Sequence, residues 1–170
     1  MELNFKPLAA EDVEVRVGTC SDKGVSLLLY KDARCDMRIL DDTVGKMNWE
    51  CDYKMIGNVL YCRVSIYDRG DGTKYPDCIS KQDCGVPSNM EPDKGAASDA
   101  FKRACFKWGI GRELYTAPFI FIGWEKCNKA QRNGNPTTYD RFTVQDMRVE
   151  DGRIIALKIK NQNTKRIVYE

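Results

Sequence analysis

Two adjacent cations, Lys102 and Arg103, occupy the middle of a segment whose apolar residues recur at helical spacing. At 100° per residue these apolar residues fall within an arc of about 100°, the width of a stripe that faces a core. They are Ala97, Phe101, Ala104, Cys105 and Trp108. The opposite arc carries Asp99, Lys102, Arg103 and Lys107. The pattern predicts a helix within residues 95–115, with Asp99 spaced to pair with Lys102 or Arg103.

A cationic helix face of this kind could bind phosphate groups, which lysine and arginine contact without reading a sequence. Phe106 projects next to Lys102 on the polar side, and an aromatic ring among cations is what base stacking requires. Simpler interpretations are also open. The polar arc could be the solvated side of an ordinary helix, and Phe106 could pack on a neighbouring element or subunit.

The net charge of the chain is only +2, but the excess of basic over acidic residues lies in its second half. Residues 1–93 carry 12 basic against 17 acidic residues, residues 94–112 carry five against one, and residues 124–170 carry ten against six. An anionic partner would therefore be met on and after the predicted helix.

Several classes of chemistry are disfavoured by the composition. The chain has no histidine, which removes the commonest general base and every Ser-His or Cys-His nucleophile. Its eight cysteines contain no Cys-x-x-Cys pair, so we expect reduced structural thiols and no metal site. No phosphate-binding glycine loop is present, so we expect no ATP use. Because no plausible catalytic constellation is seen either, we expect no cofactor and no enzymatic activity.

Neither a secretory signal nor an apolar run of the about 20 residues that a bilayer requires is visible, so we expect a cytoplasmic protein without membrane contact. A length of 170 residues favours a single domain. We expect it to have a core over about 13–116 and a strand extension over about 117–170.

The predicted elements come in runs rather than in alternating β-α-β units. A hairpin over 13–30 precedes a helix over 31–45, and three strands over 48–56, 58–68 and 73–86 precede the helix described above. Gly57-Asn58 and the RGDG at 69–72 supply the turns between these three strands.

After a short apolar segment at 117–124, the polar stretch 126–138 is predicted to be a mobile loop. Terminal strands follow, with Asp151-Gly152 as a type I′ turn. The fold class is therefore α+β: an antiparallel hairpin and a three-stranded meander packed on helices, in the order β-β-α-β-β-β-α, with extra C-terminal strands.

The run SDAFKRACFKWGIGRELY at 98–115, preceded by Lys94-Gly95, resembles the signature of the Rad52/Rad22 superfamily of single-strand annealing proteins, especially its phage and prophage members. In that family a Thr/Ser-Asp-Ala/Gly-x-Lys-Arg-Ala core precedes an aromatic residue, a glycine-containing helix end and a leucine-aromatic pair. Arg16, Tyr30 and Trp49 keep the order and approximate spacing of the family upstream. The resemblance covers about residues 13–116.

This resemblance implies ATP-independent binding and annealing of single-stranded DNA in homologous recombination and repair. Many copies would assemble into a ring or helical filament whose basic groove holds the DNA backbone. Arg16, Lys102 and Arg103 would contact phosphates, and Tyr30 would line the groove. Local charge adds Lys94, Lys107 and Arg112 to the candidate DNA-binding residues. Phe106 stands where many relatives carry another basic residue.

The resemblance also implies partners and a location. The expected partners are single-stranded DNA, further copies of the chain, and a single-strand binding protein or an exonuclease. The expected location is the cytoplasm of a bacterium or of a phage-infected host cell.

Two alternatives come from other classes of protein. A metal-dependent nuclease could use carboxylates, which are Asp68, Asp71, Asp77, Asp83, Glu91 and Asp93. A monomeric module that binds single-stranded DNA or RNA could instead stack bases on the aromatic residues of the meander. Those aromatic residues are Trp49, Tyr53, Tyr61 and Tyr67.

Overall fold

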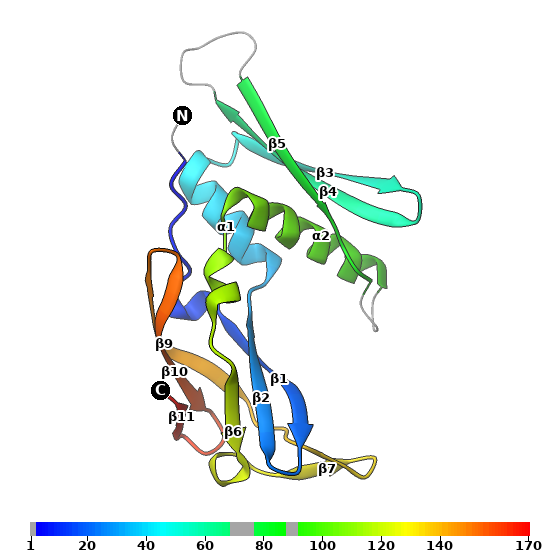
Figure 1. Ribbon diagram of the computed structural model, residues 1–170. Helices are drawn as coiled ribbons and strands as arrows, with labels where there is room; N and C mark the ends of the chain where they lie inside the picture. Colours follow the sequence, from blue (N-terminus) through cyan, green and yellow to red (C-terminus); the bar gives the residue numbers. More distant parts are fainter. Residues whose placement is uncertain (1–2, 69–76, 88–91) are drawn as a thin grey trace. The chain divides into compact units, whose positions relative to one another are not determined.

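The computed structural model describes residues 3–68, 77–87 and 92–170, and its contacts group into two compact units (Figure 1). Unit 1 comprises Met1–Lys6 and Asp32–Gly111, and unit 2 comprises Pro7–Lys31 and Arg112–Glu170. This grouping of contacts does not test whether the chain is a single domain, so the single domain stays a prediction. None of the helices in the described part of the chain is long and apolar enough to span a membrane.

Unit 1 is a three-stranded antiparallel meander packed on helices (Figure 1). Its elements are α1 (Ala33–Val44), β3 (Trp49–Ile56), β4 (Val59–Asp68), β5 (Asp77–Cys84) and α2 (Pro92–Trp108). Asp32 begins α1 by accepting a hydrogen bond from the Cys35 N–H, and Gly45 ends it with a φ of 85°. The predicted RGDG turn lies outside the described residues.

The apolar side of α2 forms the core of unit 1 as the helical spacing predicts. Phe101, Ala104 and Cys105 are fully buried, while Ala97 and Trp108 are half-buried. The ring of Phe101 lies 6.1 Å from that of Trp49, whose indole N–H donates to Asp41. The helix contacts β4 and β5 on one side of the meander.

Gly85, directly after β5, lets the chain run against the backbone of α2. A Cβ at this position would lie 1.9 Å from the carbonyl oxygen of Ala96 and 2.7 Å from the amide nitrogen of Ala100. Only glycine therefore allows this approach without moving the helix.

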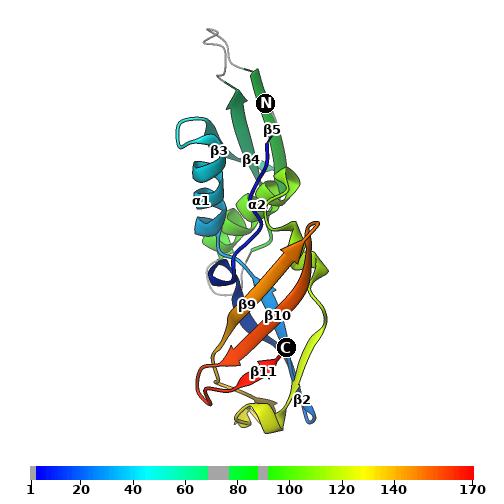
Figure 2. The same cartoon turned by 90° about the vertical axis from the view of Figure 1, so that its left-hand side faces the viewer.

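Unit 2 is built on a six-stranded antiparallel sheet of order β11-β10-β9-β1-β2-β6. The strands are β1 (Glu14–Ser21), β2 (Gly24–Tyr30), β6 (Ile120–Gly123), β9 (Phe142–Glu150), β10 (Arg153–Asn161) and β11 (Ile167–Tyr169). Figure 2 shows β9, β10 and β11 side by side. Short 3-10 helices are η1 (Ala10–Asp12), η2 (Arg112–Thr116) and η3 (Trp124–Lys126).

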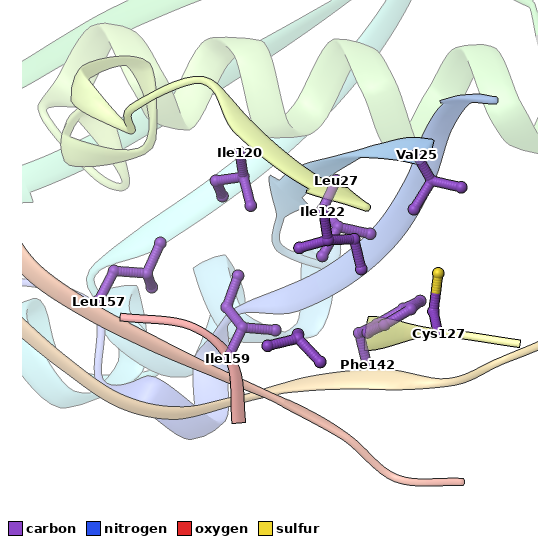
Figure 3. Packing of buried hydrophobic residues seen from close by; sticks show 9 residues of the cluster. Val25, Leu27, Ile120, Ile122, Cys127, Phe142, Leu157 and Ile159 are labelled. Carbon is purple, nitrogen blue, oxygen red and sulfur yellow. The ribbon is translucent and has the colours of Figure 1, made fainter. Parts of the chain in front are cut away.

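One apolar cluster fills the concave side of this sheet (Figure 3). Val25 and Leu27 of β2 and Ile120 and Ile122 of β6 meet residues of the C-terminal strands there. The C-terminal contributors are Phe142, Leu157, Ile159 and Val168. The C-terminal strands therefore complete the sheet that contains the first hairpin.

The predicted fold class is confirmed, including the β-β-α-β-β-β-α order and the extra strands. Asp151 and Gly152 have φ values of 48° and 70°, as a type I′ turn requires. The loop predicted over 126–138 is wrong, because β7 (Ala130–Arg132) and β8 (Asn135–Thr137) pair there. Asn133 and Gly134, with φ values of 53° and 80°, form the same kind of turn.

All eight cysteines are free thiols in this structure, and Cys35, Cys62, Cys105 and Cys127 are buried. The four buried thiols pack as small apolar side chains, which is the role that the sequence predicts, whereas Cys78 is exposed.

Asp140, just before β9, is the centre of a buried polar network in unit 2. Its carboxylate accepts hydrogen bonds from the backbone and side-chain amides of Asn128, at 2.8 and 2.9 Å, and from the side chain of Asn161 at 2.7 Å. Asn161 is fully buried and accepts from the N–H groups of Asn163 and Thr164. The network joins the segment after η3 to the β10–β11 turn.

We expect Phe101→Ala to lower the free energy of unfolding by about 3–5 kcal/mol, because it leaves a cavity against Trp49. Urea unfolding followed by fluorescence measures this loss. Met47→Ala in the same unit removes a side chain that is 78% exposed and should change stability by less than about 0.5 kcal/mol. Equal losses in the two variants would contradict the packing of α2.

We expect the stability of the wild type to depend on pH through Asp140. Burial alone would raise the pKa of Asp140, but the hydrogen bonds from Asn128 and Asn161 lower it below the usual 3.8. A lowered folded pKa gives stability that is present above about pH 4 and is lost as the pH falls through the folded value. Asp140→Asn should therefore cost about 1–3 kcal/mol at pH 7 and flatten the loss of stability in acid.

The exposed Asp146→Asn variant is the matched control for Asp140→Asn, since it removes the same charge from the neighbouring strand β9. Urea unfolding of both variants from pH 7 to pH 3 measures the difference. An unchanged acid slope in Asp140→Asn would show that the network does not hold the carboxylate ionised.

Candidate nucleic-acid interface

The cationic side of α2 lies along β5, which is an edge strand of the meander. Asp99 accepts a hydrogen bond from the Val86 N–H at 3.0 Å, and Lys107 donates to the Gln82 carbonyl at 2.8 Å. Arg103, between them on the helix, donates to Asp83 at 3.5 Å. An edge strand exposes N–H and C=O groups; Lys107 provides a partner for one carbonyl of β5, and Asp99 for the N–H of Val86 just after the strand.

Lys81 of β5 ties the same strand to the end of α2. Its ammonium donates to the carbonyl of Lys107 at 3.0 Å and lies 4.6 Å from the centre of the Trp108 ring. The indole N–H of Trp108 donates to the carbonyl of Val64 at 3.2 Å. A cation near the C-terminal carbonyls of a helix is favourable, so Lys81 stabilises this helix end.

Asp83 is the carboxylate that faces the cations of α2. Burial would raise its pKa, but the Cys84 N–H and the charges of Arg103 and Lys107 hold the pKa of Asp83 below its usual range. Arg103 and Lys107 lie 3.5 and 3.6 Å from its oxygens, and their side chains remain 46% and 49% exposed. Both cations can therefore contact a further anion, although each is partly neutralised.

Lys102 differs from its neighbour Arg103. It is half-buried, and neither an ion pair nor a hydrogen bond of its side chain is found within residues 3–68, 77–87 and 92–170. The predicted pairing of Asp99 with Lys102 or Arg103 is wrong, because Asp99 turns to the backbone of Val86 instead. Phe106, one turn further along the helix, is half-buried.

Arg16 and Tyr30 meet on neighbouring strands of unit 2. The Arg16 guanidinium carbon lies 3.6 Å from the centre of the Tyr30 ring, and the Tyr30 hydroxyl donates to Glu14. Burial and this hydrogen bond raise the pKa of Tyr30, so its phenol stays neutral at pH 7. No ion pair of Arg16 occurs within the part of the chain that the structure describes.

The remaining predicted residues are exposed: Lys94 in the first turn of α2 and Arg112 at the start of η2. The candidates thus form two sets. Unit 1 holds Lys94, Lys102, Arg103 and Lys107, and unit 2 holds Arg16, Tyr30 and Arg112. A single groove formed by both sets stays a prediction.

Among the described residues, no group of three or more His, Cys, Asp or Glu side chains could hold a metal ion. Of the carboxylates considered for a nuclease, Asp71 and Glu91 lie outside the described residues, and Asp83 contacts cations. Trp49 packs on Phe101 and is no open stacking platform.

Three features of these surfaces were missed in the sequence. The contacts of Asp83 and Lys81 with α2 are long-range and have no local signal. The exposed rings of Phe119 and Phe121, in contrast, alternate with the buried Ile120 and Ile122. This two-residue period is a strand signal that could have been read.

Comparison with protein-family models matches residues 5–133 to the family described as Rad52/22 family double-strand break repair protein. None of the curated proteins compared with the chain gives a match. The matched range contains α2 as well as Arg16 and Tyr30.

We expect Asp83→Asn to raise the affinity for a single-stranded oligonucleotide several-fold at low salt, because it frees Arg103 and Lys107 from their carboxylate. Fluorescence anisotropy of a labelled oligothymidylate measures the change. Asp52→Asn makes the same charge change where Asp52 pairs with Arg63 at 3.1 Å, on a different part of the meander, and should have little effect. A loss of affinity in Asp83→Asn would instead show that Asp83 positions the two cations for binding.

Proposed function

Because the chain belongs to the Rad52/22 family of double-strand break repair proteins, we propose that it binds single-stranded DNA and anneals complementary strands in recombination and repair. The observation that carries this proposal is Lys102. It lies in the helix with the family-like Lys-Arg pair, and no described residue neutralises its charge.

Annealing makes and breaks no covalent bond, so the protein has to supply only a surface and not a catalytic group. That surface must neutralise phosphates without sequence preference and leave the base edges accessible to a complementary strand. Lys102, Arg103 and Arg16 are cations suited to phosphate contact. We therefore propose a non-enzymatic, ATP-independent activity.

Assembly of many copies is part of the proposal. Arg103 and Lys107 are partly neutralised by Asp83, so each copy supplies few strong contacts. Copies joined in a ring or filament bind one strand tightly even so, because linked sites raise the effective concentration of one another. The basic groove would then run through equivalent residues of successive copies.

The finer assignments rest on the resemblance of residues 98–115 to phage and prophage members of the family. We propose a phage-type protein that acts in the cytoplasm of a bacterium or infected host cell. A single-strand binding protein or an exonuclease would supply the DNA strand.

We expect Lys102→Ala to weaken binding of single-stranded DNA about tenfold and to slow annealing, while its melting temperature stays within a few degrees of the wild type. The slope of log K against log salt should become less steep by about 0.7 for each phosphate that the variant no longer neutralises. Anisotropy over a salt series and annealing of complementary labelled strands in EDTA without ATP measure these effects.

Lys46→Ala is the matched control, since it removes an exposed lysine of the same unit outside α2. If both variants weaken DNA binding equally, the loss comes from net charge and not from a specific contact of Lys102. A requirement for nucleotide or divalent metal would contradict the mechanism, and a monomeric mass in the presence of DNA would favour the monomeric binding module.

A further inference from the structure

The outer face of β1, β2 and β6 carries an exposed aromatic surface whose role is unassigned. Along β2 and β6, Leu27, Ile120 and Ile122 point into the core, so the alternating residues point to the opposite face. Leu28, Phe119 and Phe121 on that face are 58%, 82% and 43% exposed. These three residues, all in unit 2, are called the aromatic face below.

The register of the sheet places Arg16 on the same face as these three residues. Arg16 pairs with Leu28, and Leu27 pairs with Ile120, which places Phe119 beside Leu28 on the other side. A hollow of about 360 Å³ is lined by Leu28, Leu114, Pro118 and Phe119. Arg16, Leu28 and Phe119 thus follow one another across three strands, over about 10 Å.

The two phenylalanine rings are arranged as a pair of parallel plates. Their centres lie 6.5 Å apart and their planes differ by 15°. Rings this close to parallel turn their faces in similar directions, so each offers a surface on which a planar base can stack. A ring face offers stacking to any base, and stacking leaves the hydrogen-bonding edges of the base accessible.

The neighbouring cation favours a nucleic acid as the occupant of the aromatic face. Arg16 borders the aromatic face and stacks on Tyr30, and no ion pair of its guanidinium is found among the described residues. Glu14 of the same strand accepts the hydrogen bond of the Tyr30 hydroxyl and forms no ion pair with Arg16 among the described residues, so the guanidinium can still contact a phosphate. A nucleotide supplies a phosphate for Arg16 and a base for the rings together.

We propose that the aromatic face binds unpaired bases of single-stranded DNA, with Phe119 and Phe121 stacking on bases while Arg16 contacts the phosphate backbone. This inference rests on the proposed function and adds to it a site for the bases. Annealing gains from such a site, because stacked bases are held apart from one another with their pairing edges free.

The test compares an oligothymidylate with an abasic oligomer of the same length, which keeps the phosphates and lacks the bases. The wild type should bind the base-bearing strand about tenfold or more tightly than the abasic one, given the stacking energies of single bases. Phe119→Ala with Phe121→Ala should reduce affinity for oligothymidylate to near the abasic value and leave abasic affinity unchanged.

Two further variants separate stacking from apolar contact. Phe119→Leu keeps an apolar side chain and loses the planar ring, so it should behave like Phe119→Ala, while Phe119→Tyr should retain the preference for bases. Ile155→Ala on β10 removes another exposed apolar side chain of unit 2 and should have no effect. Phe119 is 82% exposed, so the single variant remains a test if the double variant does not fold.

The outcomes distinguish this inference from the proposed function. A wild type that binds neither strand overturns the proposed function. If the wild type binds but the phenylalanine variants keep the full preference for bases, the stacking site is wrong and the proposed function stands. A smaller assembly mass in the variants with an unchanged preference for bases would assign the aromatic face to a contact between copies and also overturn the site.

Discussion

The closure of the β5 edge by α2 is the contact on which the arrangement of unit 1 depends. Asp99, Arg103 and Lys107, spaced four residues apart, meet Val86 just after β5 and Asp83 and Gln82 within it. Gly85 makes this possible because it lets the backbones touch. An edge strand left open is a site for association with other strands, so this row helps to cover the meander, and it engages Arg103 and Lys107, two of the candidate DNA-binding cations.

The same contact sets the electrostatic character of the helix. Lys102 and Arg103 are adjacent in sequence but differ by 100° around α2. Arg103 therefore faces Asp83, whereas Lys102 has no ion pair among the described residues. Neighbouring basic residues in such a motif are therefore not equivalent, and Asp83 sets how much charge the surface presents.

Local patterns were sufficient for most of the fold and for part of the site. The burial of Phe101, Ala104 and Cys105 follows from helical period alone, and the Asp151-Gly152 turn follows from its residue types. The contacts of Asp83 and Gly85 with α2 depend on tertiary packing, which no local pattern carries. The β7–β8 hairpin was missed because its strands are only three residues long and polar, although Asn133-Gly134 is a strong turn signal.

The limit of recognisable similarity and the limit of the folded unit do not coincide in this chain. The family match ends at residue 133, whereas Phe142, Leu157, Ile159 and Val168 fill the core against β2 and β6. A fragment cut at the end of the family match would expose the inner side of the first hairpin and lose Asp140 and Asn161. Deletion studies of the C-terminal residues would consequently report on solubility and folding before they report on any activity.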